Sequence, residues 1–112
     1  MTIGHEITHG FDSNGSNYDE TGKLNEGWLF TESERREYNS RISGLVGFLD
    51  GIAVIPGQAH SGKLTNGEIT ADMGGVAIML LMASKVKNFD YKVFFANYAK
   101  SMAKMYTLEE YK

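Results

Sequence analysis

The sequence HEITH, residues 5–9, restricts the fold more than any other feature of the chain. Residues four apart lie on the same face of an α-helix, so His5 and His9 would project to one side. Two imidazoles at this spacing can share one metal ion, and Glu6 would then point beside the ion rather than at it. The alternative is a pair of surface histidines on a short helix. The motif has chemical meaning only on a helix, which we expect over residues 2–10.

A second pair of side chains at helical spacing occurs much later, within NGEITADMGG, residues 66–75. Glu68 and Asp72 are four apart and would share one helical face. Glu68 could be a third metal ligand, while Asp72 could accept a hydrogen bond from the outer nitrogen of a ligand histidine. The alternative for Glu68 is a helix cap, because residues 65–68 (TNGE) form a capping box. Asp72 alone would be a solvated helical charge.

Asp12 follows the first motif and opens a turn-rich loop over residues 12–27. Its carboxylate could orient a ligand histidine by accepting a hydrogen bond from the ring nitrogen that does not face the metal. It could instead form only an Asx-turn, in which an Asp side chain accepts from the backbone two residues later. The sequence leaves both interpretations open.

These side chains suit zinc. The chain contains no Cys, so any metal must be held by His, Asp or Glu. A catalytic zinc site has three protein ligands and one position open to water or substrate, and His5, His9 and Glu68 would supply the three. Glu6 would lie where a general base can take a proton from zinc-bound water. We therefore expect one Zn²⁺ per chain.

The rest of the sequence predicts a mainly α-helical fold with little strand. The capping box TESE, residues 31–34, starts a helix that Gly51 ends. We expect two more helices, from residue 65 or 66 to 87 and from about residue 90. Gly74 and Gly75 lie inside the third helix, where each costs about 1 kcal/mol relative to Ala. A close approach of the HEITH helix would explain them, and a local kink is the alternative. The second helix carries an apolar face formed by Tyr38, Ile42, Leu45 and Leu49.

Composition excludes several classes of partner. The 112 residues are at most one domain, and 42% hydrophobic with 22% charged residues is ordinary for a globular protein. The net charge is −3 with no basic cluster, which argues against a nucleic-acid partner. The longest apolar run, residues 76–83, is too short to span a bilayer. The absence of Cys favours a bacterial parent protein but leaves the compartment open.

Three stretches, taken together, resemble the zinc-binding core of neprilysin-like zinc endopeptidases. They are GHEITHGFD, NYDETGKL and GKLTNGEITADMGG, and the likeness continues through DYKVFFANYAKSMAKMYT near the end. The resemblance implies a thermolysin-like zincin fold of the gluzincin type, with about four helices packed around the HExxH helix.

The same resemblance implies roles for single residues. It gives His5, His9 and Glu68 as zinc ligands and Glu6 as the catalytic base. It implies that Asp72 is a functional carboxylate, described in such enzymes as a proton donor. Its helical spacing instead favours a role in orienting His5.

The chain departs from the family pattern, and parts of the pattern are absent. Ile69 stands where Asn is usual, and Trp28 stands alone where paired Trp is frequent. The family's substrate-binding Asn-Ala segment would precede residue 1, and its substrate-gripping His and Arg would follow residue 112. A capping box at residues 107–110 also stands close to the end. We therefore expect residues 1–112 to be a single incomplete domain, truncated at both ends.

Two functions follow as hypotheses. The first is a zinc endopeptidase core that hydrolyses peptide bonds by attack of zinc-activated water. Its partners would be a peptide substrate and the remainder of the parent catalytic domain. It would be a poor protease alone, because loss of one oxyanion-stabilising group costs about a hundredfold or more. The alternative is a catalytically silent helical metal-binding or interaction module, in which Glu6 has no kinetic role.

Overall fold

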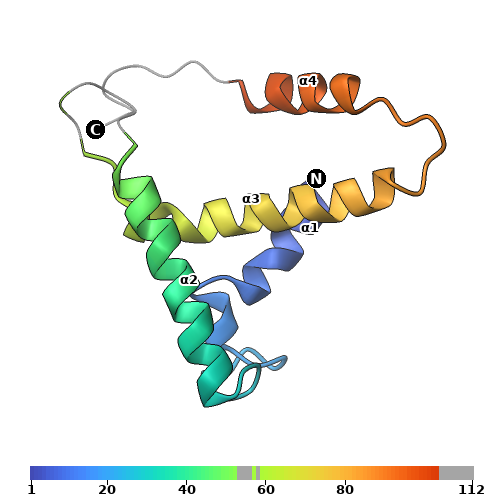
Figure 1. Cartoon of the computed structure of the whole chain (residues 1–112). Helices are drawn as coiled ribbons and strands as arrows, with labels where there is room; N and C mark the ends of the chain where they lie inside the picture. The colour runs from blue at the N-terminus through green and yellow to red at the C-terminus, as the bar shows by residue number, and fades with distance from the viewer. Residues whose placement is uncertain (53–56, 58, 104–112) are drawn as a thin grey trace. The chain divides into compact units, whose positions relative to one another are not determined.

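The structure is a computed structural model that describes residues 1–52, 57 and 59–103. An isolated antiparallel bridge between Tyr18 and Leu24 is the strand-like pairing found in this described part. The prediction of a mainly α-helical fold is confirmed. The expected capping box at residues 107–110 lies outside the described residues. The helices, in chain order, are α1 (Thr2–Thr8), the 3-10 helices η1 (His9–Phe11) and η2 (Gly15–Asn17), α2 (Glu32–Asp50), α3 (Gly62–Ala83) and α4 (Tyr91–Met102) (Figure 1).

The chain divides into two compact units, Met1–Leu81 and Met82–Lys112. The first unit contains every side chain that the sequence predicts for the site. The second contains α4, which begins as expected near residue 90, because the side chain of Asp90 accepts a hydrogen bond from the backbone N–H of Val93 at 3.0 Å. A single incomplete domain over residues 1–112 stays a prediction.

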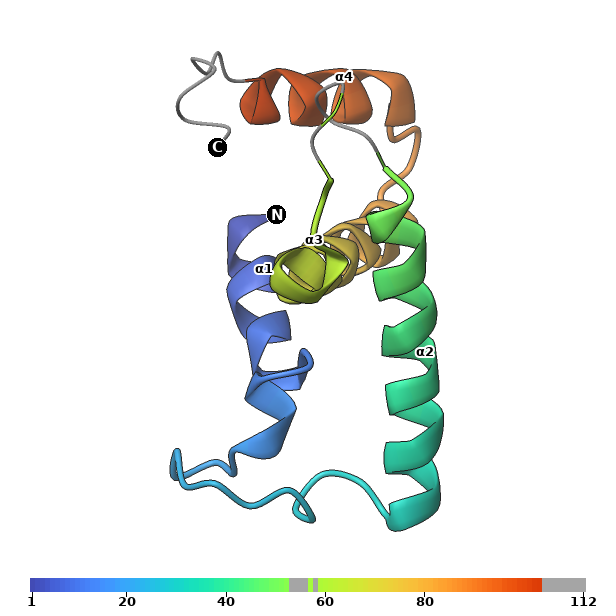
Figure 2. The same cartoon turned by 90° about the vertical axis from the view of Figure 1, so that its left-hand side faces the viewer.

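Helix α2 begins and ends where its local sequence predicts. The backbone N–H of Thr31 donates to Glu34 Oε2 at 2.9 Å, and the N–H of Glu34 donates back to Thr31 Oγ1 at 3.4 Å. This reciprocal capping box satisfies N–H groups that have no partner inside the helix. Leu49, on the expected apolar face, is buried. Viewed along α3, α1 and α2 lie on opposite sides of it (Figure 2).

Helix α3 begins at Gly62, earlier than the expected residue 65 or 66. The backbone N–H of Gly62 donates to Asp50 Oδ1 at 2.7 Å, so the last residue of α2 supports the first residue of α3. Thr65 therefore lies inside the helix, where its hydroxyl donates to the carbonyl of Ser61. The interpretation of residues 65–68 as a helix cap is wrong, and Glu68 is free for another role.

The same helix ends at Ala83 rather than at residue 87. Two 3-10-type hydrogen bonds follow, from the N–H of Lys85 to Met82 and from that of Val86 to Ala83. Asn88 then has φ of 58°, a left-handed conformation that Asn tolerates better than most residues. The expected end at residue 87 rested on the helix-breaking sequence NFD at residues 88–90, and the helix stops four residues before that expected end.

Helices α1 and α3 touch through glycine. A Cβ added at Gly4 would lie 3.1 Å from the Cα of Gly75, and one added at Gly75 would lie 3.0 Å from the backbone nitrogen of His5. A Cβ at Gly74 would overlap the side chain of Thr8. The two glycines in α3 therefore permit close approach of the HExxH helix, and α3 continues as one helix through them.

We expect Gly74→Ala to destabilise the protein by about 1–3 kcal/mol, the usual cost of overpacking. The intrinsic preference of a helix for Ala, about 1 kcal/mol, acts in the opposite direction. The contact with Thr8 should outweigh it, because that side chain is β-branched and stiff. Urea denaturation measures the change. Gly44→Ala in α2 is the matched control, since an added Cβ there meets no atom within 4 Å and should stabilise. Equal stabilisation by both substitutions would contradict the prediction.

Candidate metal centre

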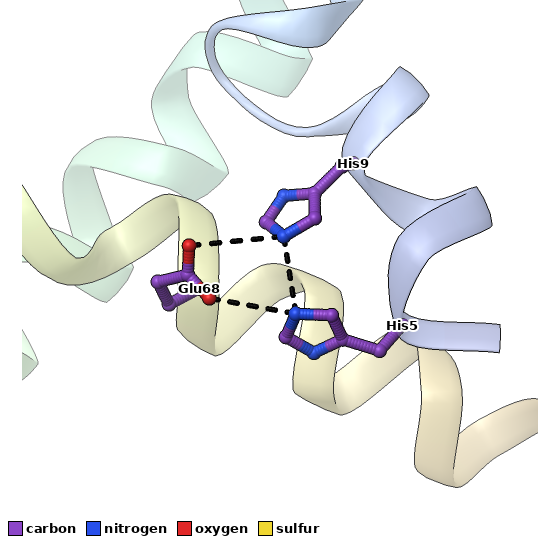
Figure 3. A group of neighbouring side chains, drawn as sticks. All are labelled: His5, His9 and Glu68. Atoms are coloured by element: carbon purple, nitrogen blue, oxygen red, sulfur yellow. Dashed lines mark hydrogen bonds and ion pairs between the residues drawn. The ribbon is translucent and has the colours of Figure 1, made fainter. Parts of the chain in front are cut away.

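Three predicted ligands come together from two helical segments. His5 lies on α1, His9 is the first residue of η1, and Glu68 lies on α3. His9 keeps right-handed helical dihedrals (φ −57°, ψ −27°), so its ring lies one turn beyond that of His5, with the two ring planes at 88° to each other. The Nε2 atoms of the two rings are 3.1 Å apart. Glu68 Oε2 lies 3.4 Å from Nε2 of His5, and Oε1 lies 3.7 Å from Nε2 of His9 (Figure 3).

These separations fit an ion of the size of zinc. Zinc–ligand bonds of about 2.0–2.2 Å at tetrahedral angles place ligand atoms about 3.4 Å apart. The three observed separations lie close to that value. One potential ligand atom from each of His5, His9 and Glu68 falls within 4.8 Å of the other two. The side chain of Glu68 is 68% exposed, so the cluster opens to solvent on that side.

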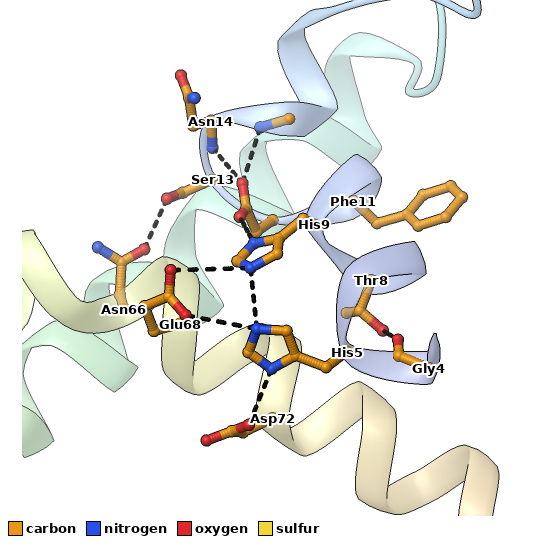
Figure 4. A network of polar contacts seen from close by, with 12 residues as sticks. Gly4, His5, Thr8, His9, Phe11, Ser13, Asn14, Asn66, Glu68 and Asp72 are labelled. Atoms are coloured by element: carbon orange, nitrogen blue, oxygen red, sulfur yellow. Dashed lines mark hydrogen bonds and ion pairs between the residues drawn. The ribbon is translucent and has the colours of Figure 1, made fainter. Parts of the chain in front are cut away.

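A carboxylate holds the far nitrogen of each ring. His5 Nδ1 is 2.9 Å from Asp72 Oδ1, and His9 Nδ1 is 2.8 Å from Asp12 Oδ2 (Figure 4). An ionised carboxylate only accepts, so each Nδ1 carries the hydrogen, and Nε2 of each ring is unprotonated when that ring is neutral. Two lone pairs and a carboxylate then face one another. A cation among them would relieve this repulsion, which makes the set of ligand atoms chemically suited to a metal.

Asp12 combines the two roles that the sequence left as alternatives. Its Oδ2 accepts from His9, while Oδ1 accepts from the backbone N–H groups of Asn14 (2.8 Å) and Gly15 (2.7 Å). The Asx-turn thus fixes the carboxylate that contacts the ring. Asp12 is also one of three buried polar residues in the described part of the chain, with 6% of its surface exposed.

The charges around His9 favour its protonated form. The hydrogen bond to Asp12 raises the pKa of His9; burial opposes this, and the negative charges of Glu68, Asp12 and Glu6 raise the pKa further. Burial alone would raise the pKa of Asp12, but the hydrogen bonds from His9, Gly15 and Asn14 together lower it. Asp12 therefore stays ionised at neutral pH. The local field attracts positive charge, whether a proton or a metal ion.

Glu6 lies beside the cluster rather than in it. It is an exposed residue of α1, directly after His5. Its negative charge is the smallest of those that raise the pKa of His9. The position suits the predicted general base, which must reach a reacting water without binding the metal.

Side chains of helix α2 form hydrogen bonds with the segment on either side of Asp12. The guanidinium of Arg35 donates to Ser16 Oγ at 3.0 Å and to the Ser16 carbonyl at 2.9 Å, and Ser16 is fully buried. The hydroxyl of Tyr38 donates to the carbonyl of Phe11 at 2.9 Å, and the indole of Trp28 donates to the Ser16 carbonyl. Sequence reasoning assigned Tyr38 to an apolar face and gave no role to Arg35. Long-range contacts of this kind leave no periodic signal in the sequence.

Sequence reasoning also missed Ser13 and Asn66. Ser13 Oγ donates to Asn66 Oδ1 at 2.6 Å, and Asn66 is 6% exposed. The one signal in the sequence was the position of Asn66, a short polar residue two positions before Glu68. The helix-cap interpretation explained Asn66 as part of the TNGE capping box, so no other role was sought for it.

Comparison with known proteins assigns the family. Residues 1–111 match the model of peptidase family M13. The chain belongs to peptidase family M13. The resemblance to neprilysin-like enzymes is confirmed, and so is the zincin-like fold, because the M13 chain is similar to PepO from Lactobacillus rhamnosis HN001. That crystal structure aligns with a TM-score of 0.68 at 33% sequence identity, over 78% of this chain and 13% of PepO.

Two relatives extend the comparison. The M13 chain is 40% identical over 100 residues to the neutral endopeptidase of Lactobacillus helveticus, which covers 89% of the chain and 15% of that protein. It is 38% identical over 92 residues to a Streptococcus gordonii protein whose name describes a zinc metalloproteinase, over 82% of the chain and 16% of that protein. The chain thus spans under a fifth of the length of these relatives. Within the described residues, none of the M13 chain's helices combines the length and apolar character that a membrane span requires.

Proposed function

We propose that this M13 chain is the zinc-binding core of a metalloendopeptidase. The observation that carries the proposal is the convergence of His5, His9 and Glu68, with both histidines held by carboxylates on their far nitrogens. Two bare ring nitrogens and a carboxylate are a ligand set of catalytic zinc sites. The name of the Streptococcus gordonii relative supports the choice of zinc, and family membership supports a peptide substrate.

The chain's own residues would divide the chemistry between them. His5, His9 and Glu68 would hold one Zn²⁺, which when bound lowers the pKa of water and polarises a substrate carbonyl. Glu6 would accept a proton from the attacking water and return it to the leaving amine. Asp72 and Asp12 would keep the two rings in the tautomer that leaves Nε2 free. Glu6 and Glu68 are both exposed, which would leave them accessible to a peptide.

We further propose that the remainder of a parent catalytic domain covers one face of the HExxH segment. Ile3, Ile7 and Phe11 are spaced four apart, and 78%, 58% and 47% of their surfaces are exposed. An apolar stripe of this kind is unusual on a free surface. Since the chain spans 15% of the Lactobacillus helveticus relative, a longer protein has ample sequence to cover it.

The test combines metal content with activity. We expect one zinc per chain in the full-length parent, and peptide hydrolysis that a chelator abolishes and added zinc restores. The 112-residue chain should bind zinc but hydrolyse peptides poorly, because it spans only 15% of the length of the Lactobacillus helveticus relative. Full activity in the presence of excess chelator, or a zinc-free parent that hydrolyses peptides, would overturn the proposal.

Asp72 offers a separate prediction because an orienting group and a proton donor differ in their effects. As an orienter of His5, Asp72→Ala should weaken zinc binding by about 10–100-fold, as loss of other outer-shell partners does. When zinc is saturating, the shape of the pH–rate profile of the full-length parent should persist. Asp12→Ala should give a similar loss through His9, and the exposed Glu37→Ala should give none. If Asp72→Ala instead leaves the zinc affinity unchanged but removes one of the two pH-dependent sides of the pH–rate profile, Asp72 is the proton donor.

A further inference from the structure

Asn66 is a buried polar residue two positions before Glu68, with 6% of its surface exposed. Its Nδ2 donates to the carbonyls of Gly62 (3.2 Å) and Lys63 (2.8 Å) within α3. Its Oδ1 accepts from Ser13 Oγ at 2.6 Å. The first two bonds hold the amide against its own helix, whereas the bond to Ser13 connects α3 to the loop after η1. A buried amide oxygen without a partner is costly, so this contact favours one placement of α3.

Ser13 belongs to the turn that holds His9. It directly follows Asp12, whose carboxylate contacts the His9 ring and closes the Asx-turn. The same carboxylate also packs against α3, because a Cβ added at Gly67 would lie 3.3 Å from Asp12 Oδ2. Two successive residues of α3, Asn66 and Gly67, therefore meet this turn, and Glu68 comes next. Figure 4 shows Ser13 beside Asn66, with Glu68 facing the two rings.

Glu68 itself contributes little to its own placement. Its side chain is 68% exposed and lies 3.4 and 3.7 Å from the two ring nitrogens. A solvated, flexible side chain reaches a fixed point reproducibly only if its backbone is held. The backbone of α3 is held on one side of Glu68 by the contact of Gly75 with His5, and on the other side by Asn66.

We propose that Asn66 is a positioning residue: its hydrogen bond with Ser13 sets the reach of Glu68 to His5 and His9. The inference rests on the proposed zinc function and adds to it a partly buried hydrogen bond that connects the helix of the third ligand to the turn that holds the second. Ser13 and Asn66 touch no reacting group. They act on the centre only through the backbone that carries Glu68.

The test is the zinc affinity of the full-length parent, measured by competition with a chromophoric zinc chelator well below the melting temperature. Ser13→Ala and Asn66→Leu remove the hydrogen bond, and each should weaken zinc binding by about three- to tenfold, the usual net effect of one buried hydrogen bond. Each is also made in a Glu68→Ala background, where the zinc affinity should fall no further. Ser43→Ala, which removes a comparable hydroxyl-to-carbonyl bond to Asn39 in α2, is the control and should leave the affinity unchanged.

The outcomes separate the two proposals. A wild-type parent that binds no zinc, or binds it equally well after Glu68→Ala, overturns both. Weaker binding after Glu68→Ala with wild-type affinity in Ser13→Ala and Asn66→Leu overturns the positioning role alone. An equal loss with and without Glu68 also overturns it, because the effect would then be a general one on the fold. Ser13→Ala is the mild variant and keeps the test decisive if Asn66→Leu fails to fold.

Discussion

Replacing Glu6 by Gln should lower kcat of the full-length parent by about a thousandfold, within the range that general acid–base catalysis contributes. The amide preserves the size and polarity of the side chain but cannot take a proton from water. Zinc affinity should change by less than about threefold, because Glu6 is not among the three residues whose ligand atoms converge. The measurement is steady-state peptide hydrolysis alongside a zinc titration of the same preparation.

This pair of measurements also separates the endopeptidase from a silent metal-binding module. A silent module predicts no hydrolysis in the wild type and no kinetic effect of Glu6. Glu37→Gln, an exposed carboxylate on α2, serves as the control and should leave kcat unchanged. A Glu6→Gln parent that keeps wild-type kcat would show that the base lies elsewhere. A large fall in zinc affinity would show that Glu6 contributes to the metal site itself.

Removing one of the three proposed zinc ligands should greatly weaken zinc binding. We expect His5→Ala and Glu68→Ala each to weaken zinc binding by more than about a hundredfold, since loss of an outer-shell partner alone costs about 10–100-fold. His5 should cost more than Glu68, because its ring is 17% exposed and locked to Asp72, whereas Glu68 is largely solvated. Competition with a chelator gives the dissociation constants. Circular dichroism of each variant checks that the helices are retained.

The third histidine provides the control for this experiment. His60 hydrogen-bonds to Thr65 and is not part of the cluster, so His60→Ala should bind zinc as the wild type does. Zinc that survives Glu68→Ala would mean that another group is the third ligand. Zinc that survives His5→Ala would mean that the HExxH histidines do not form the site.

Local sequence signals predicted the structural features that depend only on residues close together in the chain, namely the starts of helices and the side chains that share a helical face. The Thr31 box and Asp90 begin their helices by satisfying N–H groups within three residues. The spacing of His5 and His9, and of Glu68 and Asp72, placed each pair on one face. These features require only helical geometry, which the sequence encodes locally.

Contacts between distant segments decided the remainder. Helix α3 begins at Gly62 because Asp50 of α2 accepts its N–H, a contact that residues 62–68 alone do not reveal. Helix propensity alone makes Gly74 and Gly75 unfavourable in α3. They are needed because α1 lies so close to them that a larger side chain would overlap or crowd it. The sequence therefore determined the candidate ligands and the helices that carry them. Only tertiary packing decided that Asn66 meets Ser13 and that three ligand atoms converge, because both require backbone segments far apart in the chain to be brought close together.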